Sequence, residues 1–456
     1  MKSKTKKNVP VLDVKKLKVN FQTKTGKVTG VNDLSFSIFP GETVCLVGES
    51  GSGKSVSSLA IMRLVEFGGG KIDAGSIMFA SNSYVHSDLI DSDQHNMREI
   101  RGNEIGMVFQ EPMTALNPVF TIKRQLTEGL RVHKQMSKNE ANIEALNLLK
   151  SVRIPEPERR LHQYPHELSG GMRQRIVIAM ALACKPKILI ADEPTTALDV
   201  TIQAEILTLL NRLKKETGTS ILFITHDMAV VAQIADRVVV MYHGEKVEEG
   251  NVNEVFNNPK KDYTKKLISS VPKLGAMIGK KYPEPLKLDS TNKAKSIKIV
   301  GTTKPLLKVK NLVTRFPVTG GMFRKKIANL HAVEDVSFSI NRGQTFSLVG
   351  ESGCGKTTIA RSVLRLEESE SGEVFMDGVD ILKQNKKDLL RQRLNMQMVF
   401  QDPYGSLNPV MKLFDQVAEP LINYKIASGH NLNKIISELF DKVRLPRSCL
   451  LYTSDA

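Results

Sequence analysis

Cysteine and aromatic residues are scarce in this chain of 456 residues, which has 4 cysteines, no tryptophan and 5% aromatic residues. The cysteines show neither CxxC spacing nor the Cys/His spacing of a metal site; they are Cys45, Cys184, Cys354 and Cys449. This distribution argues against a disulfide framework, a zinc site and an iron–sulfur cluster. We interpret the four thiols as small apolar side chains.

Long hydrophobic runs are also missing. The most apolar segments, such as 220–225 and 238–242, are much shorter than the roughly 20 residues that a membrane-spanning helix needs. Residues 1–10 are rich in lysine but contain no apolar h-region, so we predict no secretory signal peptide. The chain is therefore expected to be made and kept in the cytoplasm.

Acidic residues are in the minority, because 65 Lys and Arg outnumber 48 Asp and Glu and leave a formal net charge of +17. The lysines are spread over the chain, and no aromatic residues alternate with them to form a platform for bases. We interpret the charge as an ordinary solvated surface, with attraction to an anionic membrane face as the alternative. No nucleic-acid partner is predicted.

The chain does contain a long internal repeat. Three segments of the first half recur in the second: 31–38 as 333–340, 46–55 as 348–357, and 107–112 as 398–403. A period of this length indicates two tandem domains rather than a solenoid. The stretch 272–305 between them is rich in Lys, Pro and Gly and lacks sustained periodicity, so we interpret it as a linker.

Expected strands and helices alternate within each repeat. Residues 43–47, 187–191 and 220–225 are short apolar runs that are typical of buried strands. Between the last two, apolar residues recur at helical spacing over 202–213, and Gly218 is a suitable end for that helix. This alternation predicts an α/β core with a largely parallel sheet.

A glycine-rich phosphate-binding pattern, GxxxxGK[ST], occurs in both repeats. In the first it comprises Gly48, Glu49, Ser50, Gly51, Ser52, Gly53, Lys54 and Ser55, followed by Val56; in the second, Gly350, Glu351, Ser352, Gly353, Cys354, Gly355, Lys356 and Thr357, followed by Thr358. Glycines let backbone N–H groups turn inward around the phosphates, and the lysine reaches the terminal ones. The hydroxyl of Ser55 or Thr357 suits Mg²⁺, and the following helix points its positive end at the anion. Because each pattern is expected to follow a strand, the sequence predicts two ATP-binding loops.

Two acids follow an apolar segment of the first repeat. Residues 187–191 are predicted to form a buried strand, and Asp192 and Glu193 come directly after it. A strand end beside the phosphate loop is where Mg²⁺ takes a carboxylate ligand, and Asp192 fits that position. Glu193 is then placed to polarise the attacking water.

A Ser169-Gly170-Gly171 turn precedes a helix expected over 172–184. Such a turn presents backbone N–H groups and a hydroxyl at a helix N-terminus, which is an anion-binding arrangement. At this spacing before Asp192 and Glu193, it resembles the signature motif of ABC ATPases. The resemblance implies that the turn contacts the γ-phosphate held by the opposing ATPase domain.

Further motifs of the ABC family match residue by residue. Gln110 and Gln401 resemble the Q-loop glutamine, which touches Mg²⁺ and the water and links the site to the membrane partner. Residues 197–199 resemble the D-loop, and His226 resembles the switch histidine that contacts the γ-phosphate.

An aromatic residue that stacks on adenine is less sharply defined. Phe21 and Phe316 precede their loops at a suitable distance, and for each of them a place in the core is an equal alternative.

Residues 164–175 and 191–199 resemble the ATPases of dipeptide and oligopeptide importers, and 258–272 resembles the segment that follows the ATPase core in that group. Residues 274–283 and 311–317 resemble its fused branch, which imports glutathione. The resemblance implies two tandem domains, each with a RecA-like, mostly parallel core, an antiparallel β subdomain and a helical signature subdomain. It further implies that ATPase domains pair with each other and that the partners are two membrane permeases and a substrate-binding protein. The expected location is peripheral, on the cytoplasmic face of the inner membrane.

The second repeat departs from that pattern because it reaches residue 446 without a signature motif or a magnesium-binding acid. We expect a complete first domain over 1–271, the linker over 272–305, and the beginning of a second domain over 306–447. Residues 448–456 do not resemble residues 164–167 and are interpreted as a non-native tail. Since an ABC site is composite, we expect weak hydrolysis unless two first domains from different chains pair.

Two alternatives remain open from the sequence. One is a soluble tandem ABC ATPase that acts on ribosomes or nucleic acid, although such proteins carry long helical insertions or zinc modules that are missing here. The other is a P-loop kinase or GTPase, neither of which needs Ser169 to Gly171.

Overall fold

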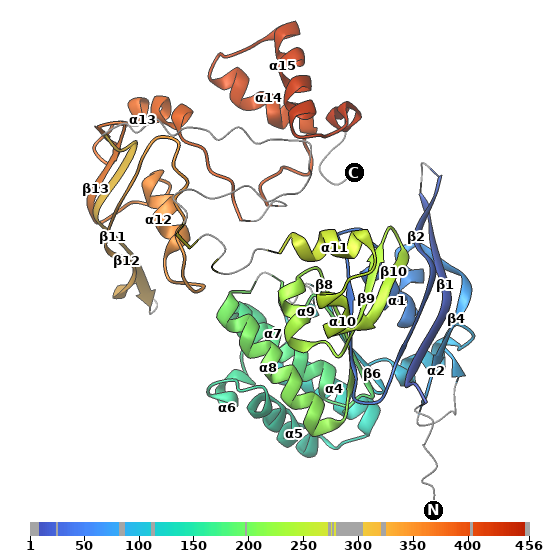
Figure 1. Ribbon diagram of the computed structural model, residues 1–456. Coiled ribbons are helices and arrows are strands. Elements are labelled where there is room, and N and C mark those ends of the chain that lie inside the picture. The colour runs from blue at the N-terminus through green and yellow to red at the C-terminus, as the bar shows by residue number, and fades with distance from the viewer. Residues whose placement is uncertain are drawn as a thin grey trace, which may run out of the picture. The chain divides into compact units, whose positions relative to one another are not determined.

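The computed structural model describes residues 9–23, 26–81, 87–110, 115–196, 198–271, 275, 278–279, 304–320, 325–401 and 405–451 (Figure 1). Its chain divides into two compact units, the first formed mainly by residues up to 298 and the second mainly by the residues beyond.

The core of the first unit is a six-stranded sheet in the order β10-β9-β3-β8-β7-β6. Its strands are β3 (Thr43–Val47), β6 (Ile105–Val108), β7 (Ile188–Asp192), β8 (Ser220–Thr225), β9 (Arg237–Tyr242) and β10 (Glu245–Asn251). All neighbours are parallel except the edge strand β10, which is antiparallel to β9. The strands expected at 43–47 and 220–225 are confirmed, and the third lies one residue later than the predicted 187–191.

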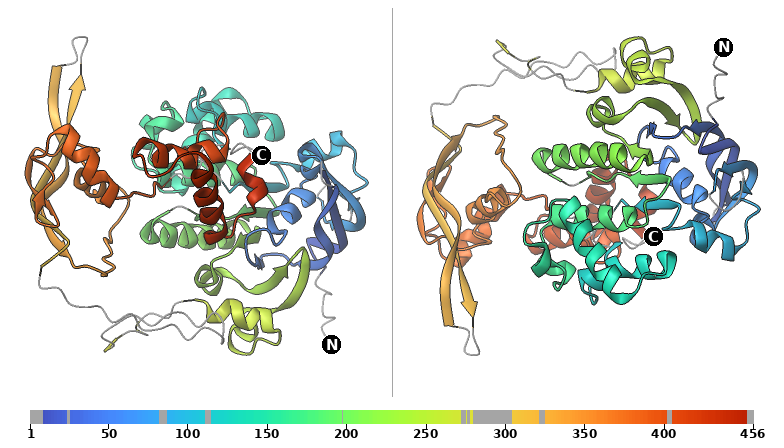
Figure 2. Two further views of the ribbon diagram at one scale, coloured as in Figure 1. Left: turned by 90° about the horizontal axis from the view of Figure 1, so that it is seen from above. Right: turned by 90° about the horizontal axis from the view of Figure 1, so that it is seen from below.

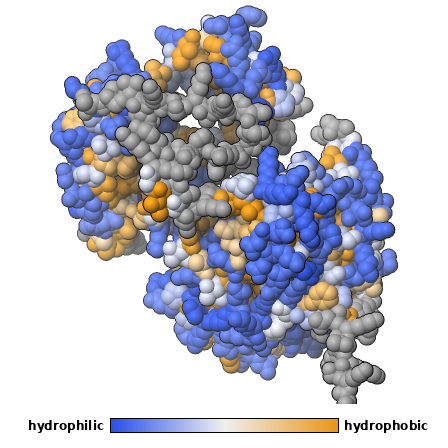
Figure 3. Space-filling view, viewed as in Figure 1, coloured by the Kyte–Doolittle hydropathy of each residue, from blue (hydrophilic) through white to orange (hydrophobic). Residues whose placement is uncertain are grey.

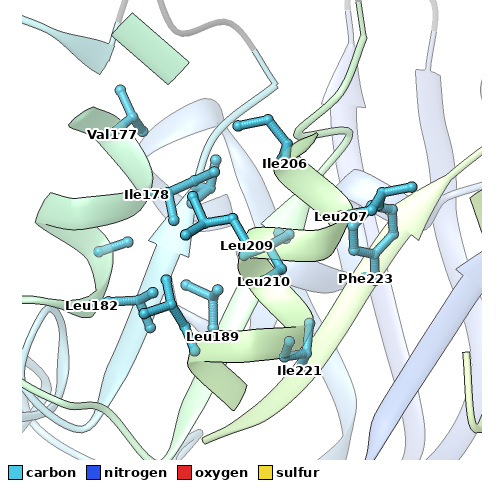
Figure 4. Packing of buried hydrophobic residues seen from close by; sticks show 14 of the residues in the cluster. Val177, Ile178, Leu182, Leu189, Ile206, Leu207, Leu209, Leu210, Ile221 and Phe223 are labelled. Atoms are coloured by element: carbon cyan, nitrogen blue, oxygen red, sulfur yellow. The ribbon is translucent and has the colours of Figure 1, made fainter. Parts of the chain in front are cut away.

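Side chains of the central strands alternate between two buried layers. Leu189, Ile221 and Phe223 belong to the layer covered by helices α7 (Gly170–Leu182) and α8 (Val200–Thr217), as Figure 4 shows. The intervening residues, such as Ile190 and Leu222, face the opposite layer. Burial on both faces explains why these strands are continuous apolar runs instead of alternating ones.

An antiparallel sheet covers the second layer, in the order β2-β1-β4-β5. It comprises β1 (Leu12–Thr23), β2 (Gly26–Ile38), β4 (Gly70–Phe79) and β5 (Ser87–Asp88). Helix α1 (Lys54–Ile61) packs into the same apolar cluster as both sheets. The short elements beside it are η1 (Val65–Gly68) and α2 (Gln94–Ile100).

Helices form the other side of the core sheet, away from the antiparallel sheet (Figures 1 and 2). They include α4 (Ile122–Lys134), α5 (Lys138–Ser151), α6 (Pro157–Arg160), η2 (Pro165–Glu167) and the signature helix α7. The predicted stop of α8 is confirmed, because Gly218 adopts φ 71° at its C-terminus. The unit ends with α9 (Met228–Ile234), α10 (Val252–Asn257) and α11 (Asp262–Ser269).

The second unit repeats the antiparallel sheet of the first. Its strands are β11 (Leu307–Gly320), β12 (Lys325–Ile340), β13 (Ser371–Met376) and β14 (Val379–Asp380), in the order β12-β11-β13-β14. Its helices are α12 (Lys356–Val363), α13 (Lys386–Gln392), η3 (Arg393–Asn395), α14 (Leu413–Asn423), α15 (Gly429–Lys442) and η4 (Arg447–Leu451). Pairing of Leu307 with Ile340 reproduces the pairing of Leu12 with Ile38.

The strand expected before the second phosphate loop is not formed. Residues 345–349 correspond to β3 but have no strand geometry, and Val349 is 90% exposed. Residues 396–399, which correspond to β6, likewise form no strand, and Val399 is 96% exposed. The physical reason is pairing: β3 has a parallel neighbour on each side, and no such neighbours occur in the described part of the second unit. Apolar side chains accordingly gather on the visible surface around α12 (Figure 3).

Candidate nucleotide-binding site

The first phosphate loop connects the C-terminal end of β3 to the N-terminus of α1. Gly48 has φ 154° and Gly53 has φ 93°. A Cβ atom at Gly48 would lie 2.2 Å from the carbonyl oxygen of Met241, and one at Gly53 would lie 2.4 Å from the carbonyl oxygen of Gly30. Both positions therefore require glycine, because the loop lies directly against the backbone of β9 and β2.

The ammonium group of Lys54 lies inside this loop. Its Nζ donates hydrogen bonds to the carbonyl oxygens of Gly48 (2.9 Å) and Glu49 (2.8 Å). Burial lowers the pKa of Lys54, and the nearby carboxylates of Glu193 and Asp192 oppose that effect. The loop thus holds a positive charge at its centre, at the positive end of α1.

Asp192 ends β7 beside the loop. Its Oδ1 accepts a hydrogen bond from the hydroxyl of Ser55 (3.1 Å), and its Oδ2 accepts one from Ser58 (3.3 Å). Burial raises the pKa of Asp192, while the Ser55 hydrogen bond acts in the opposite direction. Ser55 and Asp192 are brought together as the sequence predicts. Ser58 was not predicted, although its place one turn after Ser55 is a helical spacing that points to the same acid.

Three polar side chains converge on Glu193. The amide of Gln110 donates to Oε2 (3.1 Å), the hydroxyl of Thr196 donates to the same oxygen (2.9 Å), and Nδ1 of His226 lies 3.0 Å from Oε1. Burial by itself would raise the pKa of Glu193, but the hydrogen bonds from His226, Thr196 and Gln110 outweigh it and lower that pKa. The group is therefore kept ionised.

The backbone at Glu193 lies in the left-handed region, with φ 47°. Fourteen other non-glycine residues of the described chain also have a positive φ, so the three side-chain partners distinguish Glu193 and the backbone conformation does not. The structure joins Gln110, Glu193 and His226 as predicted, and it adds Thr196, which has no role predicted from the sequence.

Ser169 caps the signature helix α7, because its hydroxyl oxygen accepts a hydrogen bond from the N–H of Met172 (3.3 Å). Ser169 and Gly170 are exposed. A Cβ at Gly171 would lie 3.1 Å from Ile202, so the helix start packs closely against α8. In the described residues, no hydrogen bond joins Ser169 to Lys54 or Glu193.

The buried amide of Gln174 connects the signature helix α7 to the residue that follows Glu193, because it donates a hydrogen bond to the carbonyl oxygen of Pro194 (2.6 Å). In the D-loop segment, Asp199 caps α8 by accepting from the N–H of Ile202 (2.9 Å). Ala197 lies outside the described residues.

Phe21 lies on β1 and packs against the apolar cluster of the antiparallel sheet while staying partly exposed. Phe316 has a similar half-buried position on β11. The stacking of either ring on adenine stays a prediction.

The second loop repeats the end of the first, next to the helix. A Cβ at Gly355 would lie 2.2 Å from the carbonyl oxygen of Ala332, which matches the close approach of Gly53 to Gly30. Lys356 begins α12, and its Nζ lies 3.4 Å from Sγ of Cys354. Thr357 and Gln401 are exposed, and no hydrogen bond between them occurs in the described part of the chain.

The described residues contain neither a three-residue metal cluster nor a candidate membrane span. No group of three or more His, Cys, Asp or Glu side chains there is arranged to hold a metal ion. No helix in those ranges combines the length and apolar character that crossing a membrane requires.

Comparison with known protein families gives two matches. The model of the ABC transporter family matches residues 31–196 and again 333–449. The model of the oligopeptide/dipeptide transporter C-terminal region matches residues 247–296, which includes α11 and much of the predicted linker.

Curated relatives cover nearly the whole chain. The glutathione import ATP-binding protein GsiA of Escherichia coli (strain K12) is 48% identical over 443 residues, which are 95% of this chain and 71% of the relative. GsiA of Shigella boydii serotype 4 has the same identity and coverage. Among solved structures, a dimeric post-hydrolysis ATP-binding cassette with ADP and Pi is 30% identical, with a TM-score of 0.47, and the match covers 53% of this chain and 98% of that chain.

The predicted family, the α/β fold of ABC ATPase domains with a shorter second copy, and the predicted ATPase activity are confirmed by these matches. Membership of this family implies that the chain binds nucleotide and acts together with membrane permeases. The chain belongs to the ABC transporter ATP-binding proteins of the oligopeptide/dipeptide importer type.

Proposed function

We propose that this protein hydrolyses ATP to drive the import of a peptide, with glutathione as the first candidate cargo and other di- and oligopeptides as the second. The proposed catalysis is supported by the convergence of Gln110, Thr196 and His226 on the ionised Glu193. The cargo is suggested by the names of the GsiA relatives.

We assign the phosphates of ATP to the first loop. The N–H groups from Gly51 to Val56 and the ammonium of Lys54 supply positive potential in a concave loop at the start of α1. The second loop, 350–358, offers the same donors on a segment without strand support, so we assign it the weaker site.

The residues around Ser55 fit Mg²⁺. This ion prefers oxygen ligands and is usually held by one or two protein groups together with phosphates and waters. The hydroxyl of Ser55, a carboxylate oxygen of Asp192 and the amide oxygen of Gln110 are such ligands, with Thr357 and Gln401 as their counterparts in the second repeat. When bound, the ion neutralises charge that develops on the phosphate oxygens.

Glu193 is the proposed general base. A water molecule hydrogen-bonded to its carboxylate attacks the γ-phosphorus, the bond from that phosphorus to the β,γ-bridging oxygen breaks, and ADP leaves. The water proton passes to Glu193, whose lowered pKa keeps it able to accept a hydrogen bond from water at neutral pH. His226 holds Glu193 through Nδ1. The opposite edge of its imidazole ring contacts the γ-phosphate.

The signature turn serves a different ATP molecule. Ser169, Gly170 and Gly171 are exposed or half-exposed at the start of α7, and they bind the γ-phosphate that the loop of an opposing ATPase domain holds. Hydrolysis therefore requires paired domains. We propose the boundaries 1–271, 272–305 and 306–447 for the first domain, linker and second domain.

The partners are two membrane permeases and a substrate-binding protein, and the protein lies peripherally on the cytoplasmic face of the membrane. Residues 113–119 after Gln110 are the proposed permease contact, because Val119 is an exposed apolar residue there. The corresponding stretch of the second repeat is 404–410, where Val410 is exposed. Residues 113, 114 and 404 lie outside the described residues.

The test is ATPase activity in membrane vesicles that contain this chain and candidate permeases, with and without glutathione-loaded binding protein. Glu193→Gln should lower stimulated hydrolysis by at least about 100-fold while ATP binding persists, because the base is lost and the cradle remains. Glu254→Gln, an exposed carboxylate of α10, is the matched control and should hydrolyse ATP like the unaltered chain.

Stimulation by glutathione-loaded protein that Glu193→Gln abolishes would support both activity and cargo. Stimulation only with other peptides would discard glutathione and keep the importer. Full hydrolysis by Glu193→Gln would overturn the assignment of the base.

A further inference from the structure

The segment that follows the core sheet of the first unit reaches the phosphate loop through one tyrosine. Tyr263 is the second residue of α11, and its hydroxyl oxygen accepts a hydrogen bond from the backbone N–H of Glu49, with 3.1 Å between the two atoms. Tyr263 lies more than 200 residues after the loop and belongs to none of the phosphate-binding motifs. The roles assigned above do not use it.

The ring of Tyr263 is held against the strand end that the loop itself touches. Its centroid lies 4.3 Å from that of Tyr242, the last residue of β9. The carbonyl of Met241, one residue earlier, is the atom that Gly48 approaches too closely for any Cβ. The rest of α11 packs onto the core through Leu267 and Ile268.

The start of α11 is fixed from β10. The carboxylate of Glu248 accepts hydrogen bonds from the backbone N–H groups of Lys260 (2.8 Å) and Lys261 (3.1 Å). A carboxylate that binds the N–H groups at a helix start sets the position of its first turn, where Tyr263 lies.

The hydrogen bond acts on a single peptide group. The peptide between Gly48 and Glu49 is planar, so its carbonyl oxygen and N–H point in opposite directions. The carbonyl oxygen of Gly48 accepts from Lys54, and the N–H of Glu49 donates to Tyr263. Because glycine permits many backbone conformations, this peptide plane would rotate easily if either contact were lost.

We propose that Tyr263 is a positioning residue of the first phosphate loop, through which the segment containing α11 holds the loop in its nucleotide-binding conformation. This inference rests on the proposed binding of ATP by that loop. The apparent affinity of a site falls with the fraction of molecules that are in the binding conformation. Loss of the hydroxyl lowers this fraction before nucleotide binds, whereas bound phosphates order the loop afterwards.

The test uses the full chain with Lys356→Ala as background, so that binding reports on the first loop. Tyr263→Phe removes one oxygen and keeps the ring. It should weaken the binding of ADP and the binding of ATP by the same factor, about two- to tenfold, as expected for the loss of one hydrogen bond. Amide hydrogen exchange of the peptide covering 44–55 should be faster without nucleotide, while the melting temperature stays unchanged.

Tyr242→Phe is the matched control, because the hydroxyl of Tyr242 makes no hydrogen bond with the described residues and its ring contacts the same neighbour. It should leave affinity and exchange unchanged.

Equal nucleotide affinity and equal exchange in Tyr263→Phe and the background would overturn the inference. A lower melting temperature with faster exchange throughout the first unit would also overturn it, since Tyr263 would then be a general structural residue. No nucleotide binding by the background protein itself would overturn the proposed function of the first loop, which is a distinguishable result.

Discussion

Asp192 and Glu193 are neighbours in the chain, yet their surroundings shift their pKa values in opposite directions. Asp192 is buried and receives hydrogen bonds from two serine hydroxyls, and burial has the larger effect and raises its pKa. Glu193 is held by Gln110, Thr196 and His226, whose combined effect lowers its pKa. The ionised Asp192 is therefore poorly compensated in the free protein, which is the expected condition of a carboxylate that awaits a cation.

Replacing Asp192 by Asn should stabilise the nucleotide-free protein at neutral pH and abolish Mg²⁺-dependent hydrolysis. Because the folded-state pKa of Asp192 is raised above the unfolded value, its ionised form opposes folding above the folded-state pKa. As pH falls through that pKa, the folded protein takes up the proton first, and the opposition vanishes below the unfolded value. The melting temperature of Asp192→Asn should exceed that of the unaltered chain at pH 7, by about 2–4 °C per kcal/mol.

Thermal denaturation between pH 4 and 8 checks this result, since the gap should close as pH approaches the ordinary Asp value of 3.8. Asp262→Asn, with a fully exposed carboxylate, is the control and should show no gap. A gap of constant size at every pH would contradict the explanation.

At the scale of elements, two serines cap helices of the first unit in the same way. Ser169 caps α7 and Ser137 caps α5, with N···O distances of 3.3 Å and 3.4 Å. Replacing either serine by alanine should lower the free energy of unfolding by about 0.5–2 kcal/mol, the usual effect of losing such a cap. Only Ser169→Ala should also lower ATP hydrolysis in the assembled transporter, by about tenfold or more, because only that hydroxyl is proposed to bind phosphate.

Chemical denaturation and ATPase assays on both variants separate the two roles. Equal loss of hydrolysis in Ser137→Ala would show that general destabilisation, rather than lost phosphate binding, accounts for the effect.

The elements that the sequence predicted well are those whose signal is local. The apolar runs at 43–47 and 220–225 become β3 and β8 because burial on both faces demands continuous apolar residues. The helix over 202–213 was recognisable by its spacing, and Gly218 marked its end. The loop, the acids and His226 were recognisable by motif.

Other features depend on contacts between distant parts of the chain. Tyr263 contacts Glu49 because α11 folds back onto the end of β9. No local sequence pattern predicts this contact. Residues 345–349 form no strand because such contacts between distant segments are lacking there in the described structure. Their apolar sequence matches β3, but a central parallel strand exists only where neighbours pair with it.

At the scale of the whole molecule, the two repeats carry the same loop on different supports. Lys54 follows β3, which pairs with β8 and β9, and it lies within reach of Asp192 and Glu193. Lys356 follows residues 345–349, which are exposed and form no strand in the described structure. A loop needs a fixed first residue before its N–H groups can converge on a phosphate, so the first repeat should dominate nucleotide binding by this chain.

Lys54→Ala should accordingly weaken ATP binding by about 10- to 100-fold, the effect expected for a lost charge-assisted hydrogen bond to phosphate. Lys356→Ala makes the same chemical change on the unsupported loop and should weaken binding by less than about threefold. Titration of each variant with ATP, beside the unaltered chain, measures both. Equal losses in the two variants would mean that residues 345–358 are as well ordered in solution as the loop after β3, and the difference in strand pairing would then not govern where ATP binds.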